Sequence, residues 1–170
     1  MIVGVCGLPG VGKTTLANDL APLINAVVLS TDKIRKELIS NPTYTKEEKI
    51  LIYDILLLVA KYLHNAGISC ILDATFTSEN SRKNLKQKLS LTSDQICIVE
   101  CICPQDLVIL RLKDRENTFS DADILVYRKM KRTYEPVKGE HITADTSQQP
   151  SKGIAIEIAS QILKKEKNKR

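Results

Sequence analysis

The stretch from Gly7 to Thr14 constrains the fold of this chain more than any other. It fills every fixed position of the phosphate-binding pattern G-x-x-x-x-G-K-[ST], with the sequence Gly7-Leu8-Pro9-Gly10-Val11-Gly12-Lys13-Thr14. An apolar run of strand length, Met1 to Cys6, comes before it, and the apolar spacing from Thr15 to Leu20 favours a helix after it. This is the context in which the pattern binds phosphate, so the sequence predicts a nucleoside triphosphate site here.

The chemistry of this loop explains the residue types at its fixed positions. Its glycines let successive backbone N–H groups face one anion, and the start of the following helix adds a partial positive charge. Lys13 is expected to reach the β- and γ-phosphates, and the Thr14 hydroxyl is expected to ligate Mg²⁺. The alternative is a glycine-rich turn with a solvated lysine, which does not require every fixed position to be filled. We expect ATP to be held by the residues that run from the first glycine into the helix: Gly7, Leu8, Pro9, Gly10, Val11, Gly12, Lys13, Thr14 and Thr15.

Composition and charge are ordinary for a soluble globular chain. With 170 residues, of which 43% are hydrophobic and 26% charged, we expect one domain over residues 1–170. The net charge of +5 suits anionic ligands but does not by itself indicate nucleic-acid binding, and the lack of Trp argues against a base-stacking platform. No signal-peptide pattern is present, and the longest apolar run, Ile55 to Ala60, is too short to cross a bilayer. We therefore expect a cytoplasmic protein without membrane contact.

Five cysteines, at positions 6, 70, 97, 101 and 103, are interpreted as reduced, buried core residues. Those at 97, 101 and 103 fall within one strand-like run, where side chains that stand parallel do not converge on a tetrahedral zinc. The odd number of cysteines also argues against a disulfide framework.

Strand and helix patterns alternate along the whole chain. Strands are expected at 1–6, 26–30, 68–73, 95–103 and 141–144. Helices are expected at 13–24, 31–39, 45–67, 78–90 and 104–115, and another follows the residues 120–123 and ends at about 134. Capping boxes are expected at 45–48 and 120–123, and the closing helix ends in a basic tail at about 164–170. The helix at 45–67 is apolar around much of its circumference and is expected to be largely covered. The alternation predicts a three-layer α/β domain with a parallel sheet, in which ligands bind beyond the carboxyl ends of the strands.

Two of these strands end in carboxylates that suit phosphoryl transfer. Asp73 ends the apolar run Cys70-Ile71-Leu72, as does the aspartate that helps to hold Mg²⁺ in many NTPases; the alternative is a turn or capping aspartate. Asp32 follows the second strand, where a general base would lie, and Arg35 comes one helical turn later. The alternative is that Asp32 caps the helix and Arg35 is exposed, and the pattern alone leaves both interpretations open.

Arg111 and Arg115 lie one turn apart, before a segment expected to be flexible. On a closing lid at about 111–122, their guanidinium groups would neutralise charge on the transferring phosphoryl group. The alternative is a solvated helix face. The basic helix that carries Arg128 and Lys129 is interpreted as a solvated face rather than an RNA contact.

The motifs occur in a recognisable order: Gly7 to Ala17, Ser30 to Arg35, Ile71 to Phe76, Arg111 to Arg115, Ser120-Asp121-Ala122 and Glu135-Pro136. This series resembles the predicted-kinase family of P-loop proteins that is sometimes labelled an AAA domain. That family is similar to the kinase domain of polynucleotide kinases and, more distantly, to zeta toxins and chloramphenicol phosphotransferase.

The resemblance implies a five-stranded parallel sheet in the order 2-3-1-4-5 and an Arg-bearing lid. It implies that Asp32 is the general base and that Arg35 contacts the acceptor or the transferring phosphate. Asp73 would organise the metal or acceptor side, Arg115 with Arg111 would serve the lid, and the loop around Asp145 would lie near the adenine.

Together these features predict a kinase that uses ATP and Mg²⁺ to phosphorylate a hydroxyl acceptor. The first candidate acceptor is a polynucleotide 5′-hydroxyl, and the second is a small polar metabolite or antibiotic. The region from Asn41 to Gly67, where an acceptor pocket would be built, carries no motif that decides between them. The alternative function is a nucleotide-binding switch or ATPase module with no acceptor.

Overall fold

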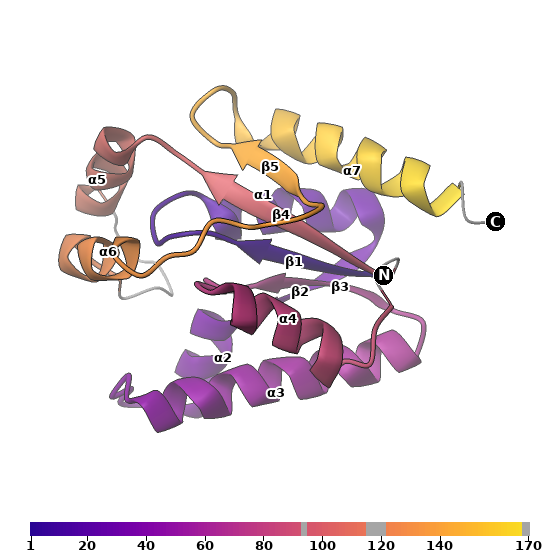
Figure 1. The fold of residues 1–170 in the computed structure, drawn as a ribbon, viewed down its shortest axis with the longest axis horizontal. Coiled ribbons are helices and arrows are strands. Elements are labelled where there is room, and N and C mark those ends of the chain that lie inside the picture. Colours follow the sequence, from indigo (N-terminus) through magenta and orange to yellow (C-terminus); the bar gives the residue numbers. More distant parts are fainter. Residues whose placement is uncertain (93–94, 115–121, 168–170) are drawn as a thin grey trace.

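Five parallel strands form the sheet of the computed structural model, which describes residues 1–92, 95–114 and 122–167 (Figure 1). The strands are β1 (Ile2–Cys6), β2 (Ala26–Ser30), β3 (Ser69–Asp73), β4 (Ile96–Ile102) and β5 (Ile142–Asp145). Their order across the sheet is β2-β3-β1-β4-β5, and every neighbouring pair is parallel. The predicted fold class and strand order are confirmed.

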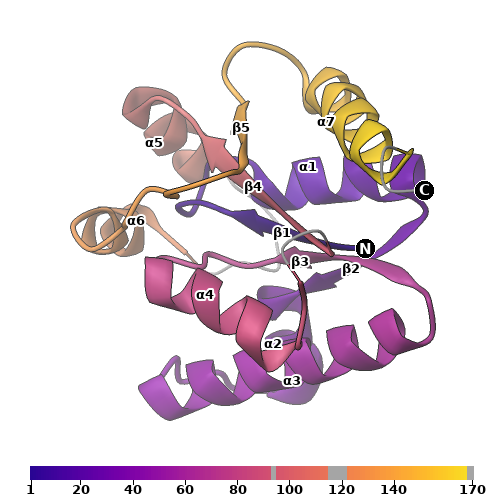
Figure 2. The ribbon, with the colours of Figure 1, turned by 45° about the vertical axis from the view of Figure 1, so that its right-hand side comes forward.

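Helices cover both faces of this sheet (Figures 1 and 2). On one face lie α1 (Lys13–Leu20) and α7 (Ser151–Lys167), and on the other lie α2 (Thr31–Leu38), α3 (Lys46–Asn65) and α4 (Glu79–Lys88). Beyond the carboxyl end of β4 lie α5 (Gln105–Lys113) and α6 (Ile124–Lys131). Apolar side chains form two core clusters, one with Leu16 and Ile158 and the other with Leu56 and Leu85. The result is three layers with the sheet in the middle.

The register of the strands aligns their carboxyl ends. Asp73 on β3 pairs with Val5 on β1 to one side and with Ser30 on β2 to the other. The phosphate loop, the start of α2 and the exit of β3 therefore begin at the same edge of the sheet, as the rule for parallel sheets predicts.

The predicted first helix is wrong at its end. The α-helix stops at Leu20, and a 3₁₀ turn, η1 (Ala21–Ile24), replaces the expected continuation. Pro22 lies in the first positions of this turn, and because proline has no N–H to donate it favours the start of a new turn over the interior of a helix.

One more boundary differs from the predicted one. The helix expected after 120–123 does begin at Ile124, where the Asp123 carboxylate caps it by accepting a hydrogen bond of 2.8 Å from Val126 N, but it ends at Lys131 rather than near Tyr134. Ser120 and Asp121 of the predicted capping box lie outside the described residues. Helix α7 continues into the expected basic tail as far as Lys167.

The outer face of α3 is less covered than the sequence predicts. Leu51 and Leu58 are each 54% exposed and Tyr62 is 70% exposed, because α3 packs on the sheet through the opposite face, which carries Ile52 and Leu56. Apolar composition around a helix thus does not by itself determine which faces are buried.

All five cysteines lie within the described residues, and none of them forms a disulfide. Cys6, Cys70 and Cys101 are buried as expected, but Cys97 and Cys103 are only half-buried, so the interpretation as buried core residues is wrong for these two. Burial raises the pKa of the Cys6 and Cys70 thiols to about 11 and that of Cys101 to about 12.

Neither a membrane span nor a metal cluster is found in the part of the chain that the structure describes. No helix there has the length and apolarity needed to span a bilayer. No three His, Cys, Asp or Glu side chains in the same residues gather in a way that would hold a metal ion.

Candidate functional site

The phosphate loop joins β1 to α1, and two of its glycines have no room for a side chain. At Gly7 (φ 136°) a Cβ atom would lie 2.5 Å from the carbonyl oxygen of Cys101. At Gly10 (φ 80°) it would lie 2.9 Å from the side chain of Val108. Both residues also have a positive φ, which favours glycine. Gly12 (φ 91°) is the N-cap of α1, so the free N–H groups at the start of that helix face the loop.

Lys13 and Thr14 lie at the first positions of α1 and already contact polar groups. The ammonium of Lys13 donates to the carbonyl oxygen of Leu8 at 2.8 Å, and the hydroxyl of Thr14 donates to Asp73 Oδ2 at 2.7 Å. Burial lowers the pKa of the Lys13 ammonium, and the charge of Asp73 opposes this change. Burial likewise raises the pKa of the Asp73 carboxyl, and Lys13 and the Thr14 hydroxyl oppose that rise.

Thr14 and Asp73 together fit a magnesium ion. Hydroxyl and carboxylate oxygens are the hard ligands that Mg²⁺ prefers, and a protein usually supplies only one or two of them beside substrate phosphates. The contact between Thr14 and Asp73 brings two such oxygens together at the edge where the phosphate loop ends. The capping alternative for Asp73 is not what the structure has, because the N-cap of α4 is Ser78.

Asp32 and Arg35 are in contact with each other at the start of α2. Arg35 Nη1 lies 3.1 Å from Asp32 Oδ1, and the ring of Tyr44 lies 4.9 Å below the guanidinium. The sequence leaves open the alternative that Asp32 is the N-cap of this helix and that Arg35 is exposed. Both parts of that alternative are wrong. The N-cap of α2 is Ser30, and Arg35 is only 5% exposed.

Glu48 is a site residue that sequence reasoning missed. The sequence indicates only a capping role for Glu48, and the cap itself is present, since Thr45 Oγ1 accepts from Glu48 N at 3.2 Å. The Glu48 carboxylate is buried and lies 2.9 Å from Arg35 Nε, and it also accepts hydrogen bonds from Thr43 and from Tyr44 N. Burial acts to raise the pKa of Glu48, but these hydrogen bonds and the Arg35 charge outweigh it, so the pKa lies below its ordinary value.

A cavity of about 860 Å³ connects these groups to the acceptor side. One end is lined by the phosphate loop together with Asp32, Arg35 and Asp73. The other end lies between α3, α4, the exit of β3 and α6, and it carries apolar, cationic and other polar side chains, among them Asp54, which pairs with Lys88. The apolar lining is Ile50, Tyr53, Leu57, Phe76, Leu85, Val126 and Met130. The cationic lining is Lys46, Lys49, Lys88 and Lys129.

Tyr44 and Phe76, which both line this cavity, have an unusual backbone. Each is a non-glycine residue in the left-handed region, with φ of 57° and 41° respectively. Phe76 is fixed by Tyr53, whose hydroxyl accepts from Phe76 N at 3.2 Å and whose ring meets the Phe76 ring edge-on at 5.6 Å between centroids. Such backbone strain tends to occur at functional sites, where the surrounding structure holds it in place.

Arg111 lies on the β5 side of the phosphate loop. Its guanidinium donates to Thr146 Oγ1 at 2.9 Å and to Thr146 O at 2.8 Å, and Thr146 Oγ1 donates in turn to Val11 O at 2.8 Å. Arg111 thus ties the end of β5 to the loop, a role for which the sequence carries no signal. Arg115, the other predicted lid arginine, lies outside the described residues.

Asp145 ends β5 beside this contact. Its carboxylate accepts hydrogen bonds from Ser147 N at 2.9 Å and from the Ser147 hydroxyl at 2.6 Å. These bonds hold the pKa of Asp145 below its ordinary value. The predicted neighbourhood of the adenine therefore consists of a turn that is ordered by its own aspartate.

Comparison with known proteins agrees with the resemblance. A sequence profile described as an AAA domain matches residues 2–137. An uncharacterized protein of Mycobacterium tuberculosis strain H37Rv is 30% identical over 130 residues, which are 69% of this chain and 26% of that protein. The chain thus spans about a quarter of the length of the curated relatives that it matches.

Solved structures share the fold. A sugar kinase from Janibacter sp. HTCC2649 superposes with a TM-score of 0.73 at 21% identity, over 94% of this chain and 92% of that one. An APS kinase of Mycobacterium tuberculosis, in complex with AMPPNP and APS, superposes with a TM-score of 0.72 at 17% identity, over 96% of each chain. These likenesses show that the chain has the fold of P-loop kinases.

Proposed function

The chain belongs to the AAA domain family of P-loop kinase-like proteins, and from this premise we propose that it is an ATP-dependent kinase. It transfers the γ-phosphate of ATP to a hydroxyl group of an acceptor. The observation that most supports this is the shared cavity, which holds the phosphate loop at one end and the Asp32 carboxylate beside it, with space for an acceptor beyond. A nucleotide switch without an acceptor needs no such space.

On the donor side, the chain's own groups position the triphosphate. Lys13 exchanges the Leu8 carbonyl for phosphate oxygens, and the N–H groups at the start of α1 face the same anion. Thr14 and Asp73 would hold Mg²⁺, which when bound neutralises charge on the β- and γ-phosphates. Arg111 and Thr146 hold the loop from the β5 side, next to the turn at Asp145 that we assign to the adenine end.

On the acceptor side, we assign Asp32 the role of general base. Arg35 holds Oδ1 of its carboxylate, and the second oxygen accepts the proton of the attacking hydroxyl. Glu48 holds the other edge of the Arg35 guanidinium, so the base is oriented by a third group, as in many activated sites. Arg35 and the lid arginine predicted at 115 supply positive charge for the transferring phosphoryl group.

The lining of the cavity favours an acceptor with an apolar body and negative charge. Lys46, Lys49 and Lys129 line it, as do the aromatic residues Tyr53 and Phe76. The 5′-hydroxyl end of an oligonucleotide meets both requirements and is the first candidate. A small polar metabolite or an antibiotic is the second. Transfer to an oligonucleotide would weaken steeply with salt because phosphate contacts release counterions.

The test is a transfer assay with γ-labelled ATP against oligonucleotides, nucleosides, sugars and aminoglycosides, run with wild type, Asp32→Asn and Glu37→Gln. Asp32→Asn should lose about 10²- to 10⁴-fold in transfer, because a general base contributes that much, while ATP affinity stays within about twofold. Glu37, an exposed carboxylate on the same helix, provides the matched control and should show no effect. Unchanged transfer in Asp32→Asn would remove the general-base assignment. Steady ATP hydrolysis with no acceptor phosphorylated would favour the switch or ATPase function.

A further inference from the structure

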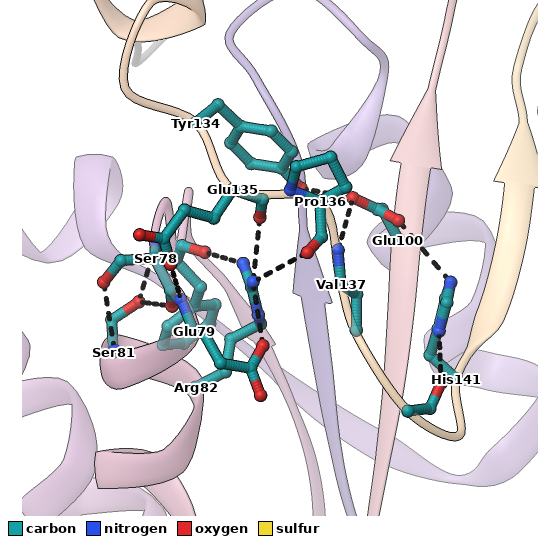
Figure 3. A network of polar contacts seen from close by, with 12 residues as sticks. Ser78, Glu79, Ser81, Arg82, Glu100, Tyr134, Glu135, Pro136, Val137 and His141 are labelled. Atoms are coloured by element: carbon teal, nitrogen blue, oxygen red, sulfur yellow. Dashed lines mark hydrogen bonds and ion pairs between the residues drawn. The ribbon is translucent and has the colours of Figure 1, made fainter.

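The segment that joins α6 to β5 is held from both sides by buried charges (Figure 3). On one side, Arg82 of α4, which is 4% exposed, donates to the carbonyl oxygens of Glu135 at 2.8 Å and Pro136 at 3.2 Å. These carbonyls belong to a stretch that is neither helix nor strand, so their main partner is this guanidinium rather than a backbone ladder.

On the other side, Glu100 of β4, which is 6% exposed, accepts from donors of the same segment. The Tyr134 hydroxyl donates to its Oε1 at 2.7 Å, and Val137 N donates to the same oxygen at 3.2 Å. The guanidinium thus binds two backbone carbonyls of residues 134–137, and the carboxylate binds the Tyr134 hydroxyl and the Val137 N–H of the same residues. Opposite charges therefore hold the segment from its two sides.

The same guanidinium also contacts the backbone of a residue that lines the acceptor cavity. Arg82 Nη1 donates to the carbonyl oxygen of Phe76 at 2.8 Å, and Phe76 lines that cavity. Glu135 strengthens the connection, because its N–H donates to Thr77 O at 2.9 Å and its carboxylate accepts from Glu79 N at 2.7 Å. The segment that follows α6 is therefore tied directly to the exit of β3.

Helix α6 itself has few buried contacts that would set its position. Tyr127 is its one buried residue within the described part of the chain, and Leu125 is 72% exposed. Yet Val126, Lys129 and Met130 of this helix line the acceptor cavity. Besides the packing of Tyr127 and Ile124 on the core and the contact of Lys131 with Gln105, the described contacts that hold this end of the helix come from the connection that follows it.

The burial of Arg82 and Glu100 makes the position of residues 134–137 energetically important. Removing a charge from water is costly unless polar partners replace the water, and here the partners of Arg82 and Glu100 include the backbone of residues 134–137. Among the described residues, a displaced segment would leave Arg82 with only Glu79 and the Phe76 carbonyl, and Glu100 with only His141, so displacement of the segment is costly.

We propose that Arg82 and Glu100 are positioning residues that hold α6 at a fixed distance from the exit of β3 and so keep the acceptor cavity in its binding shape. The effect on acceptor binding rests on the proposed kinase function, whereas the effect on α6 does not.

The test compares Arg82→Met with Lys83→Met, an exposed neighbour on the same helix, by amide hydrogen exchange and by transfer kinetics. Exchange in the α6 peptide, residues 122–133, should become at least about tenfold faster in Arg82→Met, while α1 and α7 keep their wild-type rates. With a 5′-hydroxyl oligonucleotide as acceptor, the acceptor KM should rise about tenfold or more while the KM for ATP changes less than about twofold, because misplacement of a cavity wall affects only the acceptor. Lys83→Met should match wild type in both.

Unchanged exchange in α6 would overturn the proposal, because Arg82 would then not hold this helix. A uniform rise in exchange across the whole chain would also overturn it, because Arg82 would then act on global stability alone. If Arg82→Met fails to fold, Tyr134→Phe is measured in its place, because it removes only the hydroxyl that donates to Glu100. Faster amide exchange in α6 of this variant would support the proposal, and unchanged exchange would overturn it. If wild type phosphorylates no acceptor, the proposed kinase function is wrong, while the exchange data still show whether Arg82 and Glu100 hold α6 in place.

Discussion

The donor end and the acceptor end of the cavity are built in different ways. The donor end is one continuous stretch, residues 7–15, which presents backbone N–H groups and the side chains of Lys13 and Thr14. The acceptor end is assembled from α2, α3, α4, α6 and the exit of β3, which are distant in sequence. The first needs a local backbone conformation, and the second needs several elements to be held together.

At the acceptor end, buried charges join elements that are distant in sequence. Arg35 and Glu48 join α2 to α3, and Arg82 and Glu100 hold the connection after α6. Ionic groups that are out of water are strongly sensitive to the loss of one partner. Substitution of a catalytic side chain at the donor end, such as Lys13, should therefore act mainly on nucleotide chemistry. Substitutions at the acceptor end should affect geometry and catalysis together.

The largest expected effect is at the donor end, in Lys13→Met. Loss of the ammonium should lower kcat on the order of a thousandfold, because a preorganised charge on the transferring phosphoryl group is removed from a site with little water. Transfer assays with γ-labelled ATP measure this, with the exposed Lys33→Met as control. A decrease of less than tenfold would show that Lys13 does not reach the γ-phosphate.

At the acceptor end, Arg35→Lys should cost about a hundredfold in kcat, because a single ammonium cannot hold Asp32 and Glu48 with the fixed fork of a guanidinium. ATP affinity, measured with a non-hydrolysable analogue, should stay near that of wild type. Full activity in this variant would mean that the orientation of Asp32 does not depend on Arg35.

Gly10→Ala tests how tightly the donor loop is packed. A Cβ atom there would lie 2.9 Å from Val108 and 3.0 Å from Leu112. We expect a loss of about 1–3 kcal/mol in unfolding free energy, as for an overpacked core, measured by chemical denaturation. Gly139→Ala is the matched control, since Gly139 has a similar φ of 87° but nothing within 4 Å of the added atom. Equal losses in the two variants would mean that backbone conformation, not the clash, is responsible.

The smallest expected effect is the change with pH of the difference in unfolding free energy between wild type and Glu48→Gln. Because the folded-state pKa of Glu48 lies below its ordinary value, its carboxylate stabilises the fold at neutral pH, and this contribution is lost as pH falls through the folded-state pKa. Wild type should therefore be more stable than Glu48→Gln at pH 7, and the two should converge in acid. Denaturation curves across this range measure the difference. A gap that does not change with pH would show that the charge of Glu48 is not involved.

Sequence alone determined those features of this protein that depend on residues close together along the chain. The phosphate loop, the alternation of strands and helices and the carboxylates at the ends of β2 and β3 are local patterns, and the parallel sheet follows from them. The placement of Asp32 and Asp73 at one edge follows as well, because parallel strands end on the same side.

Tertiary structure alone decided which charges are buried and which partners they have. Nothing near Arg35 in the sequence indicates that Glu48 and Tyr44 enclose it, and nothing near Arg111 points to Thr146. The same holds for Arg82, whose partners at 135 and 136 follow a different helix, and for the exposed outer face of α3. The physical reason is that a hydrogen bond or an ion pair depends on distance in space, whereas a sequence pattern records only distance along the chain.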